Sequence, residues 1–318
     1  QLQCLNPDGG KVLWTSDALT DTPAGAAWEG DKVLVWGGAD VAYLDGKTGK
    51  SLWKVDLRRL PGVDVVMGGG EVVPPPAGQP ALPPGRVLRP GLVIEGGAVR
   101  IIGGAAAAEA VVVDRRGVPQ PRGGEEIVQH LRPLSDRVVV GSSTGRVLAV
   151  NLSDGKLIWQ TRIATRDIRH LAANDLFIAA RVEDTQQSMV SLVALDTFSG
   201  QQTWRGEFSM QQRDWPINVA LAPDGMLVYT NMRGQLRGKD LCEPGDAGWT
   251  QALNRQFYGL AGPDQLLIHN GQEVLALSRN GVIDRCDVRT GKVFGQPLQT
   301  LAGNDPIVRM QAVGENLY

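Results

Sequence analysis

The side chains that could carry chemistry in this 318-residue sequence are few and widely spaced. The three histidines (His130, His170 and His269) show neither H-x-x-x-H nor H-x-H spacing, so the sequence predicts no metal site and favours ordinary surface or core histidines. There is no G-x-S-x-G elbow for a serine nucleophile and no P-loop for a nucleotide. The glycine-rich stretch Met67–Glu71 lacks the lysine and the following helix that a phosphate cradle requires, so it is interpreted as a turn.

The cysteines Cys4, Cys242 and Cys286 are far apart and form no C-x-x-C pair, so neither a metal site nor a thiol redox site is predicted. One disulfide between two of them stays open, although three idle thiols are favoured. The formal net charge of −2 creates no overall field that would attract nucleic acid or an anionic membrane. No run of 18 apolar residues is present, so we predict no transmembrane segment and no nucleic-acid partner.

An eleven-residue phrase that ends in an aromatic residue organises the rest of the chain. Clear copies are "YLDGKTGKSLW" (Tyr43 to Trp53), "AVNLSDGKLIW" (Ala149 to Trp159), "ALDTFSGQQTW" (Ala194 to Trp204) and "CLNPDGGKVLW" (Cys4 to Trp14), and weaker copies are "LRGKDLCEPGDAGW" (Leu236 to Trp249) and "RCDVRTGKVF" (Arg285 to Phe294). The copies alternate with short apolar strands that follow polar turns, and the sequence contains 40 glycines and almost no helical periodicity. Two interleaved patterns in the same phase indicate a repeat architecture.

Each copy contains the parts of a tight turn followed by a large apolar side chain. An Asp or Asn can accept hydrogen bonds from the turn amides, and a glycine four residues later provides the positive φ that the turn requires. The predicted turn pairs are Asp45 and Gly49, Asn151 and Gly155, Asp196 and Gly200, and Asp287 and Gly291. The closing aromatics are predicted to dock one sheet against the next, and they are Trp14, Trp53, Trp159, Trp204, Trp249 and Phe294.

Most closing aromatics recur about every 40 to 45 residues. A repeat of this length predicts an all-β fold, a β-propeller of four-stranded antiparallel blades. A four-stranded sheet cannot bury both of its faces alone, and radial stacking covers them while leaving short edges. We predict seven blades, or eight if Arg58–Gly123 contains a second blade, in a single domain of residues 1–318 with a proline- and glycine-rich insertion at about 67–90. The N- and C-terminal strands are expected to close the ring in one blade, with Leu2–Leu5 joining Ile307–Gln311 and Glu315–Tyr318.

The phrase A-x-D-x-x-T-G-K-x-x-W resembles the tryptophan-docking motif of the quinoprotein-like (PQQ-repeat) propeller superfamily, and the likeness covers nearly the whole chain apart from Arg58 to Pro90. The enzymes of that superfamily use pyrroloquinoline quinone, a calcium ion held by Glu, Asn and Asp, a catalytic Asp and a vicinal Cys-Cys disulfide. Because Cys4, Cys242 and Cys286 are never adjacent, the chain is more similar to the non-catalytic BamB-like members. The resemblance implies no catalytic residue, no cofactor and no metal.

Two stretches after the docking phrases are predicted to contribute to a partner surface. "RDIRH" (Arg166 to His170) and "QQRDWP" (Gln211 to Pro216) lie where the chain crosses to the next innermost strand. Arg166, Arg169, Arg213 and Trp215 would form a basic and aromatic patch there, and solvated loop charge is the alternative interpretation.

We therefore expect a non-enzymatic scaffold that binds another protein or a protein complex. The alternatives are a quinone-dependent dehydrogenase and a propeller that binds a carbohydrate or another small ligand. The family resemblance implies an extracytoplasmic location in the periplasm or cell envelope, although the given chain starts without a signal-peptide pattern. We expect it to be a mature or excised piece of a longer protein.

Overall fold

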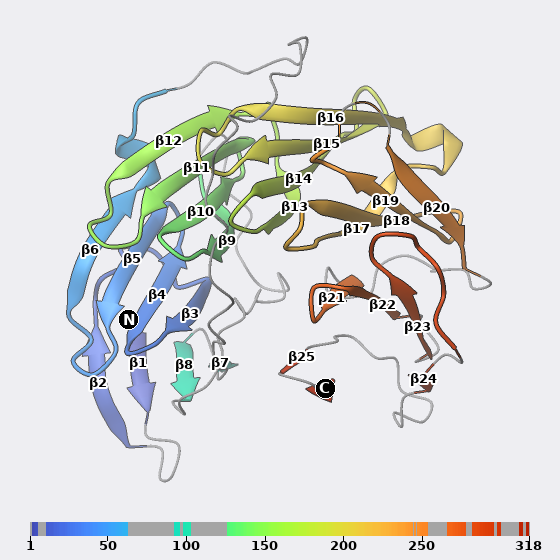
Figure 1. The fold of residues 1–318 in the computed structure, drawn as a ribbon. Coiled ribbons are helices and arrows are strands. Elements are labelled where there is room, and N and C mark those ends of the chain that lie inside the picture. The colour runs from blue at the N-terminus through green and yellow to red at the C-terminus, as the bar shows by residue number, and fades with distance from the viewer. Residues whose placement is uncertain are drawn as a thin grey trace. The chain divides into compact units, whose positions relative to one another are not determined.

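The structure is a computed structural model (Figure 1) that describes residues 2–5, 11–62, 92–95, 98–102, 126–243, 245, 247–253, 266–277, 282–295, 298–299, 312–313 and 316–317. The described residues form two compact units, unit 1 up to Thr165 and unit 2 from Arg166 onward. The predicted insertion at 67–90 lies outside the described residues, and the single domain of residues 1–318 stays a prediction.

Unit 1 contains three four-stranded sheets, in the orders β2-β1-β8-β7, β3-β4-β5-β6 and β12-β11-β10-β9. Their strands are β1 (Leu2–Leu5), β2 (Val12–Ser16), β3 (Gly25–Glu29), β4 (Lys32–Gly37), β5 (Asp40–Asp45), β6 (Ser51–Asp56), β7 (Leu92–Glu95), β8 (Ala98–Ile102), β9 (Val128–Pro133), β10 (Arg137–Ser142), β11 (Arg146–Asn151) and β12 (Leu157–Arg162). A single 3-10 turn, η1 (Leu57–Arg59), follows β6.

Unit 2 contains three four-stranded sheets, in the orders β13-β14-β15-β16, β17-β18-β19-β20 and β21-β22-β23-β24, and a two-stranded sheet, β25-β26. Their strands are β13 (Ile168–Ala173), β14 (Phe177–Asp184), β15 (Met189–Asp196), β16 (Gln202–Ser209), β17 (Pro216–Leu221), β18 (Met226–Asn231), β19 (Gln235–Asp240), β20 (Gly248–Ala252), β21 (Leu266–His269), β22 (Glu273–Leu277), β23 (Val282–Asp287), β24 (Leu298–Gln299), β25 (Ala312–Val313) and β26 (Asn316–Leu317). The 3-10 turn η2 (Met210–Gln212) follows β16.

The burial of the strands shows why the sequence forms such sheets. The central strands β10 (Arg137–Ser142) and β18 (Met226–Asn231) are buried along their whole length. For β18, apolar clusters connect its sheet with a neighbouring sheet on each side. β-branched residues such as the run Val138–Val140 pack well on such pleated surfaces. The outer strand β6 is mostly exposed or half-buried, and Trp53 is its only fully buried residue. The prediction of an all-β fold of four-stranded sheets is confirmed.

The predicted closure by the terminal strands is not the pairing observed. β1 (Leu2–Leu5) pairs antiparallel with β2 and parallel with β8 (Ala98–Ile102), so strands occupy both of its edges. β25 and β26 pair with each other in a separate sheet, and Ile307–Gln311 lies outside the described residues. The prediction is wrong because β8 is a short apolar strand of the same kind, and apolar pattern alone does not select a strand's partner.

Apolar clusters join neighbouring sheets within each unit. In unit 1, one cluster connects the sheet of β3–β6 with that of β9–β12, and another connects β1 and β2 with β3–β5. In unit 2, one cluster connects the sheet of β13–β16 with that of β17–β20, and another connects the latter with β21–β23. Among the described residues no helix has the length and apolar character needed to cross a membrane.

Candidate partner-binding surface

Three of the predicted docking tryptophans hydrogen-bond to the turn of the following sheet. Trp14 Nε1 donates to the carbonyl of Gly46 (2.7 Å), Trp53 Nε1 to that of Leu152 (2.8 Å) and Trp249 Nε1 to that of Val288 (3.0 Å). Each indole also lies on the turn glycine: a Cβ added to Gly49, Gly155 or Gly291 would fall within 3 Å of the ring. Each tryptophan therefore combines apolar packing with one directional bond to its neighbour.

The four predicted turns share a hydrogen-bond pattern in which the Asp or Asn side chain accepts from a Thr or Ser two or three residues later. Asp45 Oδ1 accepts from the Thr48 amide (2.8 Å) and hydroxyl (2.7 Å). Asp287 bonds in the same way to Thr290, and Asp196 to Ser199; Asn151 bonds to Ser153. The glycines Gly49, Gly155, Gly200 and Gly291 all have φ between 69° and 71°. The left-handed conformation explains why glycine closes each turn.

The remaining predicted docking residues differ in their surroundings. Trp204, on β16, is partly buried and packs against the cluster that contains Ala179, Leu192 and Tyr229. Trp159 lies on β12, opposite Ala149 of β11. Phe294 is 38% exposed and belongs to no apolar cluster of the described chain.

The segments that follow the outer strands β2, β6 and β16 are residues 17–24, 57–62 and 210–215, and we call them the crossing segments. Polar side chains from the hairpins between the two inner strands of a sheet bond to them. Asp40, fully buried at the start of β5, accepts from the Thr20 amide (2.7 Å). Arg146, at the start of β11, donates to the carbonyls of Leu57 (2.7 Å) and Pro61 (3.2 Å). Arg233 donates to the Gln212 carbonyl (2.9 Å). The crossing segments are thus fixed by side chains that repeat in position but not in residue type.

A chain of contacts in unit 2 brings together two of the four residues predicted for the partner surface. Glu183 pairs with Arg169 (3.3 Å) and with Arg181, whose guanidinium lies 5.6 Å from the centre of the Trp215 ring. Arg181 also donates to the Ile217 carbonyl (2.6 Å). Burial and the neighbouring charge of Arg169 lower the pKa of Arg181 to about 10. The result is a half-buried network of arginine and tryptophan at the start of β13 and β17.

The other two predicted residues flank this network. Arg166 donates to the hydroxyl of Thr185 (3.2 Å), next to the end of β14. Arg213 has a left-handed backbone (φ 56°) at the end of η2, and its exposed side chain makes no ion pair or hydrogen bond within the described part of the chain. The segment after η2 therefore presents an exposed guanidinium two residues before Trp215.

Of the histidines and cysteines, His170 lies beside this surface, opposite Arg181 in the pairing of β13 with β14, and the others lie on other segments of the chain. His130 and His170 are buried on β9 and β13, and His269 ends β21, where it bonds to Asn270. All three cysteines are free; Cys4 and Cys286 are buried, and Cys242 is exposed. Burial and the nearby carboxylates of Asp284 and Glu273 raise the pKa of Cys286 to about 12, so this thiol stays protonated.

Sequence reasoning missed Arg181 and Glu183, which connect the predicted residues. Both lie inside a strand, on β14, and their spacing of two residues places them on the same face of the sheet. An Arg-x-Glu pair within an apolar strand was the signal available, but the position of Trp215 beside it depends on how two sheets pack. The anchors Asp40, Arg146 and Arg233 were missed for the same reason.

Successive four-stranded sheets with Asx-glycine turns that receive a tryptophan define a β-propeller of PQQ-like repeats. The model of the family described as "Outer membrane protein assembly factor BamB" matches residues 1–190, more than half of the chain. The chain therefore belongs to this family.

Solved structures give the same fold at low identity. BamB from Moraxella catarrhalis is 14% identical, with a TM-score of 0.50 over 97% of this chain and 72% of that one. BBS1N, solved in complex with ARL6DN, is 11% identical, with a TM-score of 0.51 over 94% of this chain and 75% of that one. No curated protein matches the sequence.

Proposed function

We propose that this chain is a non-enzymatic, extracytoplasmic β-propeller that binds another protein of the cell envelope and acts as an assembly scaffold. Membership of a family described as an outer membrane protein assembly factor supports this role and this location. The observation that carries the proposal is the surface formed by Arg166, Arg169, Arg213 and Trp215, with Arg181 beneath the tryptophan ring. Arginine and tryptophan are the residues most enriched among the energetic centres of protein interfaces.

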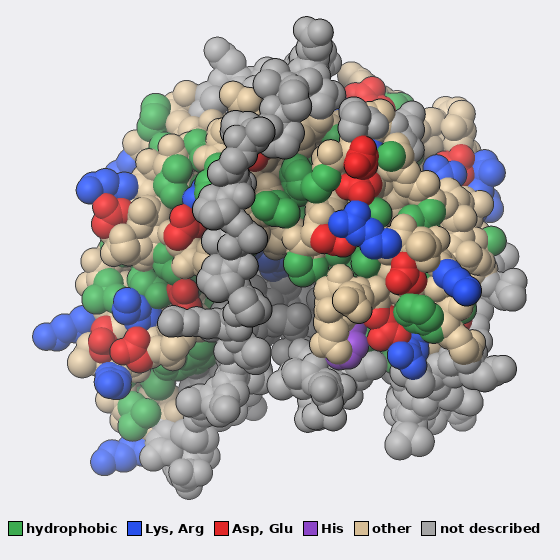
Figure 2. Space-filling model, in the orientation of Figure 1, with side chains coloured by type: hydrophobic (Ala, Val, Ile, Leu, Met, Phe, Trp, Pro, Cys, Tyr) green, Lys and Arg blue, Asp and Glu red, His purple; other side chains and the backbone are tan. Residues whose placement is uncertain are grey.

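The rigidity of this surface favours binding. Arg233 bonds to the carbonyl of Gln212 and pairs with Asp214 (2.6 Å), so the segment that presents Arg213 and Trp215 is held before a partner arrives. A preorganised segment loses less conformational entropy on binding. Figure 2 shows one face of the molecule, on which acidic and basic side chains are interspersed. At the proposed surface Arg169 pairs with Glu183 and Arg233 with Asp214, which favours a partner with mixed charge over a uniformly acidic one.

The test is site-specific photo-crosslinking in the cells that make the protein. A photoreactive residue at Arg213 should give one discrete adduct with an envelope protein of the outer membrane assembly machinery, and a residue at Lys47 in unit 1 should not. Trp215→Ala should weaken binding of the identified protein by roughly tenfold or more. An absent adduct at Arg213, or stoichiometric calcium-dependent uptake of pyrroloquinoline quinone by the purified protein, would overturn the scaffold proposal.

A further inference from the structure

β16 (Gln202–Ser209) is the edge strand of the sheet β13-β14-β15-β16, and among the described residues no strand pairs with its other side. Figure 1 shows it as the outermost arrow of that sheet. It has 8 residues, whereas the corresponding strands β2, β6, β12 and β20 have 5 or 6. A long unpaired edge exposes a row of backbone donors and acceptors that another strand can use.

The register with β15 decides which groups face the open side. The Met210 amide donates to the Ser188 carbonyl (2.9 Å), and Phe208 and Gly206 lie opposite Val190 and Leu192 in the same alternation. In an antiparallel pair only every second residue bonds to the neighbouring strand. The N–H and C=O groups of Arg205 and Glu207 therefore point away from β15, toward the open edge.

The side chains of β16 divide between its two faces. Trp204 and Phe208 fold over Gly206, where an added Cβ would lie 2.6 Å from the tryptophan ring. Arg205 and Glu207 lie on the opposite face, with Arg205 Nε donating to Glu207 Oε1 (3.0 Å). The Glu207 side chain is 58% exposed, so its carboxylate remains accessible to a second cation.

We propose that two copies of this chain associate through β16, paired antiparallel about a twofold axis at Gly206. In this register Arg205 of each copy lies opposite Glu207 of the other, and Trp204 lies opposite Phe208. Thr203 then faces Ser209. The cross-strand pairs therefore join opposite charges, two aromatic rings, or two hydroxyl groups. Such pairs stabilise neighbouring strands, and one patch that serves both copies is the form a twofold interface takes.

The charges select this register against its neighbours. A shift that keeps the open-edge groups paired moves the axis to Arg205 or to Glu207. Either shift places two arginines or two glutamates directly opposite each other, as does parallel pairing in register. Like charges in that position destabilise the pair. The two charged residues thus exclude open-ended edge association while permitting one dimer.

β6 provides an internal comparison because Lys54 and Asp56 occupy the same positions after Trp53 that Arg205 and Glu207 occupy after Trp204. Lys54 pairs with the buried Asp40 (2.9 Å), and Asp56 caps η1 and pairs with Arg58 (2.8 Å). β6 also ends at Asp56. Arg205 also bonds within its own sheet, to Glu207 and to Ser191 (3.0 Å). The two strands differ in the carboxylate, because Asp56 is only 15% exposed whereas Glu207 is 58% exposed, so the proposal concerns β16 alone.

Sedimentation velocity on the full chain tests the pairing through charge reversal. The wild type should show a concentration-dependent monomer–dimer equilibrium, and Arg205→Glu and Glu207→Arg should each raise the dimer dissociation constant about tenfold or more, because all four facing charges become alike. An equimolar mixture of the two variants should restore the dimer, since the carboxylates of one variant would then face the guanidinium groups of the other. Lys47→Glu, an exposed charge reversal in unit 1, should leave the equilibrium unchanged.

A backbone variant tests the strand pairing in a second way. Arg205→Pro removes an N–H that faces the open edge but keeps the backbone bonds to β15, so it should fold and yet abolish the dimer. Arg205→Ala is its control: it loses the same charge and the same side-chain bond to Ser191 (3.0 Å) but keeps the N–H, so it should dimerise more strongly than the proline variant. A wild type that stays monomeric at the highest soluble concentration would overturn the proposal, as would variants that dimerise normally or a mixture that fails to associate. None of these outcomes depends on the surface around Arg213, so the assembly function can fail or hold separately.

Discussion

Two junctions between neighbouring sheets use the same tryptophan in different surroundings. The Trp53 junction joins the sheets of β3–β6 and β9–β12 in unit 1, and the Trp249 junction joins those of β17–β20 and β21–β24 in unit 2. In both, the indole donates to a backbone carbonyl of the receiving turn and covers a glycine with φ near 70°. The anchor is therefore constant, and the packing around it varies.

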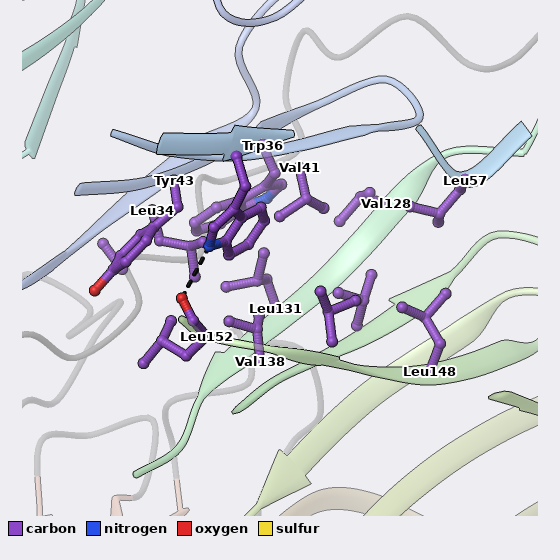
Figure 3. Close-up of a cluster of buried hydrophobic side chains, with 14 of the residues drawn as sticks. Leu34, Trp36, Val41, Tyr43, Leu57, Val128, Leu131, Val138, Leu148 and Leu152 are labelled. Atoms are coloured by element: carbon purple, nitrogen blue, oxygen red, sulfur yellow. Dashed lines mark hydrogen bonds between the residues drawn. The ribbon is translucent and has the colours of Figure 1, made fainter. Parts of the chain in front are cut away.

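The Trp53 junction depends on apolar contact. Figure 3 shows Leu34, Trp36 and Tyr43 of one sheet facing residues of the other, with the bond from Trp53 to Leu152 drawn as a dashed line. Trp53 is only 8% exposed. Large side chains from both sheets fill the space around it, so most of the adhesion comes from buried apolar area.

The Trp249 junction adds ion pairs to a core with smaller side chains. Its apolar cluster includes Ala220, Ala222 and Cys286, and Trp249 is only partly buried. Arg289, in the receiving turn, pairs with Asp224 (2.6 Å) and Asp240 (2.7 Å) of the preceding sheet. The weak copy of the repeat phrase that ends in Trp249 thus coincides with these two ion pairs, which we call the ionic clamp. Both junctions keep the bond from the tryptophan to the turn, and the contacts around that bond differ.

Trp53→Ala should produce the largest effect of the changes considered. Truncation of a packed tryptophan costs about 3–5 kcal/mol of unfolding free energy, and we expect roughly 2–3 kcal/mol for Trp249→Ala because that ring is partly exposed. Denaturant melts measure both. Leu52→Ala, which removes a 50% exposed neighbour, is the control and should cost little. Equal losses at the two tryptophans would contradict the ranking.

Gly155→Ala tests whether the glycine is needed only for the left-handed turn or also for the close packing of the Trp53 ring. The new Cβ would lie 2.8 Å from the Trp53 ring, in a backbone with φ of 71°. Gly30→Ala is the matched control, because φ is 61° there and nothing lies within 4 Å. The left-handed conformation alone costs about 1–2 kcal/mol. Thermal melts should show a clearly larger loss for Gly155→Ala, and similar losses would mean that the ring moves aside freely.

Arg289→Met should weaken only the Trp249 junction, and only modestly. Exposed ion pairs contribute about 0.2–1 kcal/mol each, and the Arg289 side chain is 47% exposed. The loss should shrink in high salt because mobile ions screen the charges. Lys47→Met changes the equivalent turn position of another junction, where the side chain makes no ion pair within the described residues, and it should be neutral. A loss that salt does not reduce would indicate lost packing instead.

The sequence predicted the local parts of these junctions and missed the long-range ones. Asp287 and Gly291 were identifiable because their contacts lie within five residues of each other, and the turn chemistry follows from residue type. The partners of Arg289 lie 49 and 65 residues away, so they depend on which sheets are neighbours. The same limit explains the missed Arg181–Trp215 contact and the wrong partner predicted for Leu2–Leu5. The repeat pattern therefore predicts the strands and turns within one sheet, whereas the surface residues that meet depend on how neighbouring sheets pack.

The smallest predicted effect concerns pH, and it separates the two junctions. The receiving turn of the Trp249 junction uses Asp287, whose pKa is lowered by hydrogen bonds from the hydroxyl and amide of Thr290. The receiving turn of the Trp53 junction uses Asn151, which does not titrate. A carboxyl with a lowered pKa in the folded state stabilises the fold above its ordinary pKa of about 3.9, and that contribution is lost as the pH falls through the folded value. The turn at Asn151 also contains Asp154, whose pKa is lowered by hydrogen bonds from Lys156, so the comparison is made in Asp154→Asn. In that variant acid should loosen the turn at Asp287 before the turn at Asn151.

Hydrogen exchange at the turn glycines measures this difference, because the Gly291 amide donates to the Asp287 carbonyl and the Gly155 amide to the Asn151 carbonyl at the same distance of 2.9 Å. After correction for intrinsic exchange rates, protection at Gly291 should fall as the pH drops from about 5 to about 3, while protection at Gly155 should hold in Asp154→Asn. Asp287→Asn should make the two turns respond alike, and Asn151→Asp should transfer the acid sensitivity to the Trp53 junction. If Gly291 lost protection equally in Asp287→Asn, the titrating group would lie elsewhere, with Asp224 and Asp240 of the ionic clamp as the next carboxylates to replace.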